Sequence, residues 1–240
     1  MIVKNQDEKA YWQLIKEIGA HNDRWDESVS TKSDIIDKLI KSLDPVAKNI
    51  LFTSFNPIAI DLAKSYNVSI ISNSELTTVF DFSKIELVDM NSAKQYDIVL
   101  SLDEYFTYAG TEDQQRDLLD QVRSKTNGWL ITTLQDYKNF APHKKNHIDA
   151  FGINGEHNYT VLENSIADRI DKQVWNHYFY CIKDHDDLLT IGPIKRRTMY
   201  FKQLAKYSSD AGSKQYVIQK NLLYKGFFSK NFEHIITVKF

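Results

Sequence analysis

"NILFTSFNPIAIDLAKSYNVSIISNSE", residues Asn49 to Glu75, contains two short apolar runs separated by a segment with helical spacing. The runs are typical of buried strands, and Pro57 opens the segment between them, at a position favoured in the first turn of a helix. This order predicts a βαβ unit. In nucleotide-binding units of this kind, a glycine-rich loop after the first strand lets the ligand approach the backbone. Here the loop contains no glycine, so the sequence leaves open whether a site is built in another way or is absent.

The same alternation continues as far as Leu134. "KIELVDMN" and "QYDIVLSLDEY" have the pattern of further strands, "TEDQQRDLLDQVRSK" that of an amphipathic helix capped by Thr111, and "GWLITTL" that of another strand. Strands that are apolar on both faces and alternate with helices predict a parallel sheet that is covered by helices on both sides.

Further elements are expected on either side of this unit. Before it, Asp7–Ile18 and "STKSDIIDKLIKSLDP" have helical spacing, and the polar stretch "GAHNDRWDESVS" between them is expected to be a loop. Near the C-terminus, "KRRTMYFKQLAKYSSDAG" predicts a helix that ends at Gly212, and two terminal strands follow it. The polar, irregular stretch from Gln135 to Lys172 precedes the aromatic strand "VWNHYFYCIK", which indicates a hairpin insertion that builds a substrate pocket.

We therefore expect an α/β fold in three αβα layers. Its sheet is expected to have seven strands, mostly parallel, with an antiparallel C-terminal strand and a β-rich insertion after the fifth strand.

The composition limits the partners. The 240 residues are 42% hydrophobic, which is enough for a sizeable core, and 30 basic against 32 acidic residues give a formal net charge of -2. This balance favours a small-molecule partner over nucleic acid, because no global charge steers a polyanion to the protein. The single cysteine, Cys181, excludes an intrachain disulfide, and neither a secretory signal nor a membrane-spanning apolar run occurs. We expect a cytoplasmic protein without a membrane partner; a protein partner stays open.

A resemblance extends these expectations. In element order from about Tyr11 to the C-terminus, and in "ILFTSFNP", "ELVDMN" and "YDIVLSLDEYFTY", the chain resembles the class I methyltransferases that use S-adenosylmethionine, whose fold is Rossmann-like. The resemblance implies that cofactor and a single domain over residues 1–240. Within the domain it implies N-terminal helices (1–48), a cofactor-binding half (49–134), an insertion that forms the substrate region (135–195), and a C-terminal helix with a strand pair (196–240).

The resemblance also implies positions for the cofactor site. The first loop would contact the amino-acid and sugar parts of the cofactor, an acidic residue after the second strand its ribose, and residues after the third strand its adenine, while the end of the fourth strand lines the floor. The matching residues are Thr53, Ser54 and Asn56; Glu75, with Asn73 as an alternative; Asp89 and Met90; and Ser101 and Asp103. Asn56 is the best substitute for the missing glycine, because asparagine tolerates the left-handed region.

The acceptor would lie beyond the fifth strand, since ligands bind outside the carboxyl ends of parallel strands. Asp136 and Tyr137 in "TTLQDYKN" are the catalytic candidates, with Asp136 contacting or deprotonating the methyl acceptor. Glu104 follows the fourth strand at the same edge and ranks with Asp103. Asp97 begins that strand at the opposite edge, so we expect it to be structural.

Two other chemistries receive little support. His143 and His147 stand four residues apart, but no third ligand completes a zinc pattern, so no metal is expected. Lys195, Arg196 and Arg197 form a small basic cluster at the expected start of the C-terminal helix, and an ordinary surface is favoured over a nucleic-acid site.

Two functions remain. The first is an S-adenosylmethionine-dependent methyltransferase that acts on an unidentified small molecule. The alternative, motivated by the glycine-free loop, is a catalytically inactive scaffold of the same fold that serves as an interaction or structural protein. Frequent Asn, Lys, Ile and Tyr indicate an AT-rich genome, such as that of a bacterial virus.

Overall fold

A mixed sheet forms the centre of the protein. The computed structural model describes residues 9, 12–14, 16, 23–71, 77–135, 146–153, 157–184, 187–224 and 232–240. The sheet has seven strands in the order β10-β11-β5-β4-β1-β2-β3. Their bounds are β1 (Asn49–Phe52), β2 (Asn67–Ile71), β3 (Ile85–Val88), β4 (Tyr96–Ser101), β5 (Thr126–Leu134), β10 (Gln215–Tyr224) and β11 (Phe232–Lys239). Neighbours among β1 to β5 are parallel, and β11 runs antiparallel to both β5 and β10.

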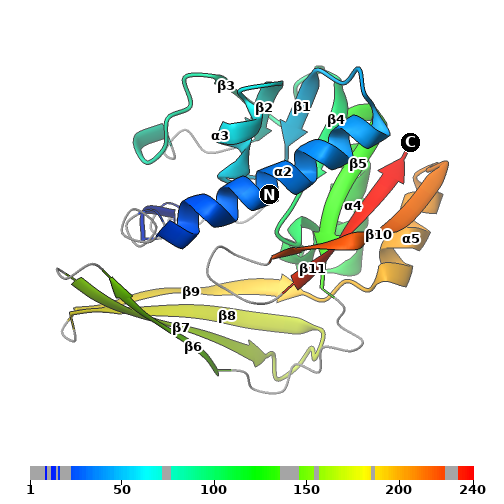
Figure 1. Ribbon diagram of the computed structural model, residues 1–240. Coiled ribbons are helices and arrows are strands. Elements are labelled where there is room, and N and C mark those ends of the chain that lie inside the picture. Colours follow the sequence, from blue (N-terminus) through cyan, green and yellow to red (C-terminus); the bar gives the residue numbers. More distant parts are fainter. Residues whose placement is uncertain are drawn as a thin grey trace.

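Helices cover both faces of this sheet (Figure 1). One face carries α2 (Asp23–Leu43) and α3 (Ile58–Leu62), and the other carries α4 (Glu112–Arg123) and α5 (Phe201–Asp210). Each layer buries its own apolar cluster against the strands, so the core is divided by the sheet into two halves. The predicted three-layer α/β fold is confirmed.

The local signals near α4 are also confirmed. Thr111 Oγ1 accepts a hydrogen bond from Gln114 N at 3.2 Å, and Gln114 Oε1 accepts one from Thr111 N, also at 3.2 Å, which is a capping box. At the other end of the fold, Gly212 has a φ of 84° just after α5, as its expected role as a helix cap requires.

Two predicted boundaries are wrong. The polar stretch expected as a loop is helical from Asp23, because nothing breaks the helix there and Val29 packs against the core. The C-terminal helix begins at Phe201 rather than near Lys195. Residues 195–197 form a strand that pairs with residues 174–176, and this pairing binds their backbone N–H and C=O groups.

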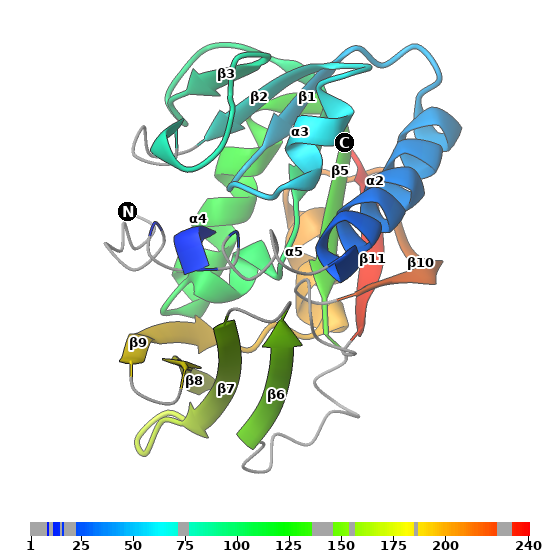
Figure 2. The same ribbon diagram turned by 60° about the vertical axis from the view of Figure 1, so that its left-hand side comes forward.

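A second sheet forms the insertion. It is an antiparallel meander of four strands in the order β6-β7-β8-β9. Their bounds are β6 (Asn146–Ile153), β7 (His157–Ala167), β8 (Val174–Lys183) and β9 (Asp187–Arg197). Figures 1 and 2 show this sheet beyond the ends of β4 and β5, at the carboxyl edge of the parallel strands. The predicted β-rich insertion is therefore confirmed, and it covers the edge at which ligands bind in open α/β folds.

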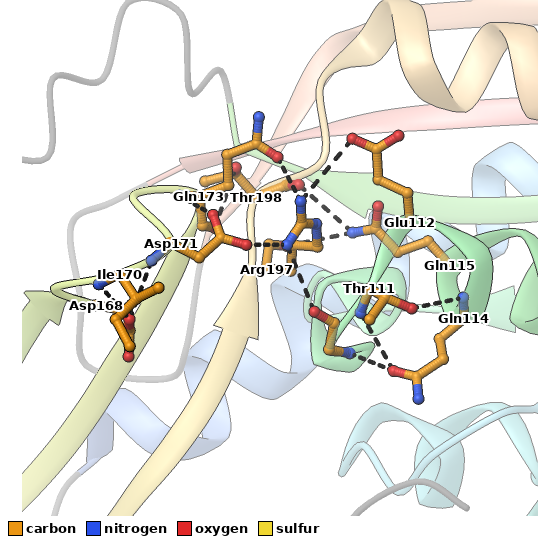
Figure 3. Close-up of polar contacts among 11 residues, drawn as sticks. Thr111, Glu112, Gln114, Gln115, Asp168, Ile170, Asp171, Gln173, Arg197 and Thr198 are labelled. Atoms are coloured by element: carbon orange, nitrogen blue, oxygen red, sulfur yellow. Dashed lines mark hydrogen bonds and ion pairs between the residues drawn. The ribbon is translucent and has the colours of Figure 1, made fainter.

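Arg197 fastens this second sheet to the main body (Figure 3). Its Nη1 donates to Asp171 Oδ2 at 2.5 Å and its Nη2 to Gln173 Oε1 at 2.8 Å, both in the turn between β7 and β8. From the main body, Gln115 Nε2 on α4 donates to the Arg197 carbonyl at 3.4 Å. Polar contacts of Arg197 thus connect β9 to α4.

The described part of the chain contains neither a membrane-spanning helix nor a cluster of metal ligands. No helix in it is both long and apolar enough to span a bilayer. No group of three His, Cys, Asp or Glu side chains in it could hold a metal ion.

Candidate functional site

The order of the sheet makes β1 a topological switch point. This strand lies between β2 and β4, so the chain moves outward in one direction from β1 to β3 and in the other from β4. Ligands in open α/β sheets bind at such a switch point, outside the carboxyl ends of the two central strands. A ligand site is therefore expected at the loops after β1 and β4.

Hydroxyl groups join the ends of these two strands. Thr53 Oγ1 donates to Ser101 Oγ at 3.1 Å, and Thr53 N donates to the Leu100 carbonyl at 3.0 Å. Both hydroxyl side chains are buried. The structure brings these two predicted cofactor residues together and turns them toward each other, so they join the carboxyl ends of β1 and β4.

Asn56 links the two loops. Its Nδ2 donates to Asp103 Oδ2 at 2.8 Å, and its Oδ1 accepts from Ile58 N at 3.1 Å. The side chain thus binds the N–H of the first residue of α3 and crosses the switch point to the loop after β4. A hydrogen bond between side chains of the two loops fixes their separation without a glycine.

The left-handed backbone lies elsewhere than the sequence predicts. Among the described residues other than glycine, positive φ occurs only at Asp103 (54°), Glu104 (57°) and Asp184 (52°). The expectation that Asn56 replaces glycine through a left-handed backbone is therefore wrong; its amide side chain acts instead. The unusual backbone belongs to the acidic pair after β4, where non-glycine residues hold it only if their surroundings fix them.

Phe55 closes the loop after β1 on the side of α2. Its ring centroid lies 4.6 Å from that of Phe80, 5.4 Å from that of Phe82 and 5.0 Å from that of Trp12. Only 2% of the side chain is exposed. Aromatic packing thus stabilises a segment that lacks glycine and is otherwise held by polar contacts.

Charged side chains are buried around the same edge. Glu104 is fully buried, and Lys32 and Glu233 are each 1% exposed. Burial lowers the pKa of the Lys32 ammonium, and the carboxylates of Asp103 and Glu233 oppose that shift. Helix α2, the loop after β4 and the start of β11 therefore meet in one group of opposite charges.

Glu104 has the densest set of contacts in this group. Its Oε2 accepts from Arg196 Nη1 on β9 at 3.1 Å, and its Oε1 accepts from Gln135 N at 3.2 Å. Its own N–H donates to Thr133 Oγ1 at 3.2 Å. These contacts fix both the carboxylate and the left-handed backbone.

Arg196, on β9, connects Glu104 to the second sheet. Besides Glu104, its guanidinium donates through Nη2 to the Tyr108 hydroxyl at 2.6 Å, and only 12% of the Arg196 side chain is exposed. In the basic cluster considered for nucleic acid, Arg196 and Arg197 lie on β9 and pair with carboxylates of this chain, whereas Lys195 is exposed.

Tyr108 provides a pH test of this arrangement. Burial raises the pKa of its phenol to about 12, although Arg196 opposes the shift. The folded state therefore favours the neutral phenol, and this stabilisation is complete below about pH 10 and is lost as the pH rises from about 10 to about 12. We expect Tyr108→Phe to lose less stability than the wild type over this range, by up to about 1.4 kcal/mol per pH unit. Urea unfolding at pH 8 and pH 11 measures this, and parallel declines would contradict it.

The remaining predicted residues are distributed as follows. Asp89 is exposed beyond β3, where its Oδ1 accepts from Asn91 N at 2.7 Å, and Met90 beside it is half-buried. Ser54 is half-buried in the loop after β1. Glu75, Asn73, Asp136, Tyr137 and His143 lie outside the described residues.

Asp97 has the structural role that its position predicts. Its Oδ2 accepts from the backbone N–H groups of Lys48 and Asn49, each at 2.8 Å, at the amino end of β1. A polar groove of about 500 Å³ lies at this same edge, lined in part by Ser69, Glu86 and Lys94. It is on the edge opposite the switch point.

Three residues of the buried charge group were missed from the sequence. Lys32 stands four and eight residues before Ile36 and Ile40, so it lies on the apolar stripe of α2, which is a recognisable signal for a buried lysine. Glu233 similarly shares strand alternation with Ile235. Arg196 had no comparable signal, because its partner is 92 residues away in the sequence.

These features define the class of fold: it is the fold of the S-adenosylmethionine-dependent methyltransferases of class I. Among solved structures, the chain is similar to S-adenosylmethionine-bound CalS10, an amino pentose methyltransferase from Micromonospora echinaspora, with 12% identity, a TM-score of 0.69, and 92% of this chain and 94% of that chain covered. The sugar N-methyltransferase KedS8 from Streptoalloteichus matches with 11% identity, a TM-score of 0.67, and 88% and 87% covered.

A third structure agrees. An S-adenosylmethionine-dependent methyltransferase from Clostridium acetobutylicum has 15% identity and a TM-score of 0.63, with 88% of this chain and 91% of that chain covered. No protein-family model and no curated protein sequence matches the chain. At these identities the likeness concerns the fold.

Proposed function

We propose that this protein is an S-adenosylmethionine-dependent methyltransferase that acts on a small molecule. The observation that carries the proposal is the Asn56–Asp103 hydrogen bond of 2.8 Å across the switch point, in a fold that methyltransferases share. It holds the loops after β1 and β4 in a fixed relation at the position where such a fold binds its ligand.

The charges at this edge suit the cofactor. Among the described residues, the carboxylates of Asp103, Glu104 and Glu233 lie at this edge together with the cations of Lys32 and Arg196. When bound, the cofactor would supply an activated methyl group on a positively charged sulfur, and the half-buried carboxylate of Asp103 favours such a cation. Asp103 and Asn56 are the described residues that would hold it, with Glu75 and Asp89 as the predicted ligands of its ribose and adenine.

The acceptor that we infer is a small molecule with an amine. Two similar structures are an amino pentose methyltransferase and a sugar N-methyltransferase, and the Asp103 carboxylate favours an amine over an anionic acceptor. Little further chemistry is required of the protein, since methyl transfer depends mainly on alignment and on exclusion of water. Asp136 and Tyr137 remain the candidates for contacting the acceptor, and Asp136 for removing its proton.

Calorimetric titration with S-adenosylhomocysteine tests the cofactor. We expect micromolar binding to the wild type, and binding about tenfold to a hundredfold weaker for Asp103→Asn, because one charge-assisted hydrogen bond to Asn56 or to the ligand is lost. Glu86→Gln is the matched control, since its carboxylate lies at the opposite edge of the sheet and its loss is expected to leave the affinity unchanged. No heat from folded, ligand-free wild-type protein would refute the proposal.

The alternative, an inactive scaffold, is favoured by one observation. Phe55 and Pro57 are both buried in a loop that lacks glycine, and Phe55 contacts three aromatic rings. A loop closed in this way binds a ligand only if the packing lies beside the crevice rather than within it. The same titration separates the two functions, because the scaffold is expected to give no heat.

A further inference from the structure

We infer that Arg196 is a positioning residue that couples the second sheet to the cofactor-facing loop through Glu104. The inference rests on the proposed function and deepens it: the sheet that covers the acceptor side would respond to cofactor binding through one ion pair. Glu104 lies at the point where the chain enters the insertion and where it returns from it.

The contacts of Glu104 place both ends of the insertion at one carboxylate. Gln135, whose N–H donates to Oε1 at 3.2 Å, directly follows β5, where the insertion begins. Arg196, whose Nη1 donates to Oε2 at 3.1 Å, lies at the end of β9, where the insertion finishes. A displacement of this carboxylate therefore acts on both ends of the second sheet.

The backbone connects Glu104 to the cofactor side. Asp103 precedes it directly, has the same left-handed conformation, and accepts the hydrogen bond from Asn56. Two consecutive residues with positive φ have few alternative conformations available. A ligand that shifts Asp103 consequently shifts Glu104, and with it the guanidinium of Arg196.

Arg197 offers a matched comparison. It is the next residue on β9 and also fastens the second sheet, but its side chain contacts the turn at Asp171 and Gln173 and approaches Glu112 on α4 (Figure 3). It also donates to the Gly110 carbonyl at 3.5 Å, but in the described part of the chain it forms no hydrogen bond or ion pair with Asp103, Glu104 or Tyr108. If docking alone mattered, the two arginines would be equivalent.

Hydrogen–deuterium exchange tests the coupling. The proteins are the wild type, Arg197→Met, and the double variant Glu104→Gln with Arg196→Met, each without ligand and with saturating S-adenosylhomocysteine as determined by calorimetry. The double variant removes both charges and keeps an amide oxygen that can accept from Gln135 N. Arg196→Met alone would leave a buried carboxylate without its arginine, so we expect the double variant to fold more stably than that single variant.

In the wild type and in Arg197→Met, we expect the ligand to slow exchange in β8 and β9 by about fivefold or more. In the double variant the ligand is expected to change exchange there by less than about twofold, while its thermal midpoint stays close to that of the wild type. A structural role alone would move the ligand-free exchange and the midpoint, but not this difference.

Three results would overturn the inference. Full ligand protection of β8 and β9 in the double variant would show that the ion pair transmits nothing. Equal loss of protection in Arg197→Met would show that docking in general carries the effect. Absence of ligand binding to the wild type would remove the proposed function itself, and calorimetry distinguishes this result from the other two.

Discussion

Arg196→Met is expected to lower the free energy of unfolding by about 3–5 kcal/mol. The side chain pairs with a Glu104 carboxylate that is fully buried, and methionine fills a similar volume without neutralising it. Breaking a buried pair by removing one partner costs more than the pair itself contributes, because the remaining charge stays out of water. Urea unfolding followed by circular dichroism measures the loss.

The double variant is the control for this prediction. Adding Glu104→Gln to Arg196→Met removes the uncompensated charge, so most of the lost stability is expected to return. A double variant as unstable as Arg196→Met would mean that packing of the guanidinium, rather than charge, determines the loss. A single variant within about 1 kcal/mol of the wild type would contradict the burial of the pair.

Phe55→Ala is expected to cost about 3–5 kcal/mol of stability, because it leaves a cavity among three aromatic rings. Phe82→Ala is the matched control: Phe82 belongs to the same group of rings but is half-buried, so its loss is expected to cost less. Urea unfolding of both variants gives the comparison.

Phe55→Ala also tests where the Phe55 ring lies relative to the ligand. If its ring packs beside the crevice, S-adenosylhomocysteine is expected to bind Phe55→Ala no more tightly than the wild type. Tighter binding by about tenfold would mean that the ring occupies the cofactor position, and it would favour the inactive scaffold.

The fold could be predicted because its signals are local. Pro57, the apolar runs around it and the Thr111 cap each act over a few residues, and right-handed βαβ connections then leave few sheet arrangements. The start of α2 was predicted wrongly because local signals alone do not determine it. Ser30 and Thr31 resemble a cap, but packing of Val29 against the core extends the helix beyond them.

The site was less accessible from the sequence. Thr53, Ser101, Asn56 and Asp103 are expected at strand ends, and the parallel sheet brings them together, while their role in binding the cofactor stays a prediction. The role of Asn56 was misread, since its hydrogen bond to Asp103 spans 47 residues. Long-range ion pairs such as that of Arg196 depend on how the two sheets meet, and no local pattern encodes that.

The closeness of the two ends of the insertion has a consequence for how such a protein diversifies. Gln135 directly follows β5 and Arg196 lies at the end of β9, and both of these residues contact one carboxylate. A segment whose ends meet can be exchanged as a cassette, since the strands on either side keep their register. Recombination or design could thus replace the second sheet as a unit, provided that the new segment supplies a cation for Glu104.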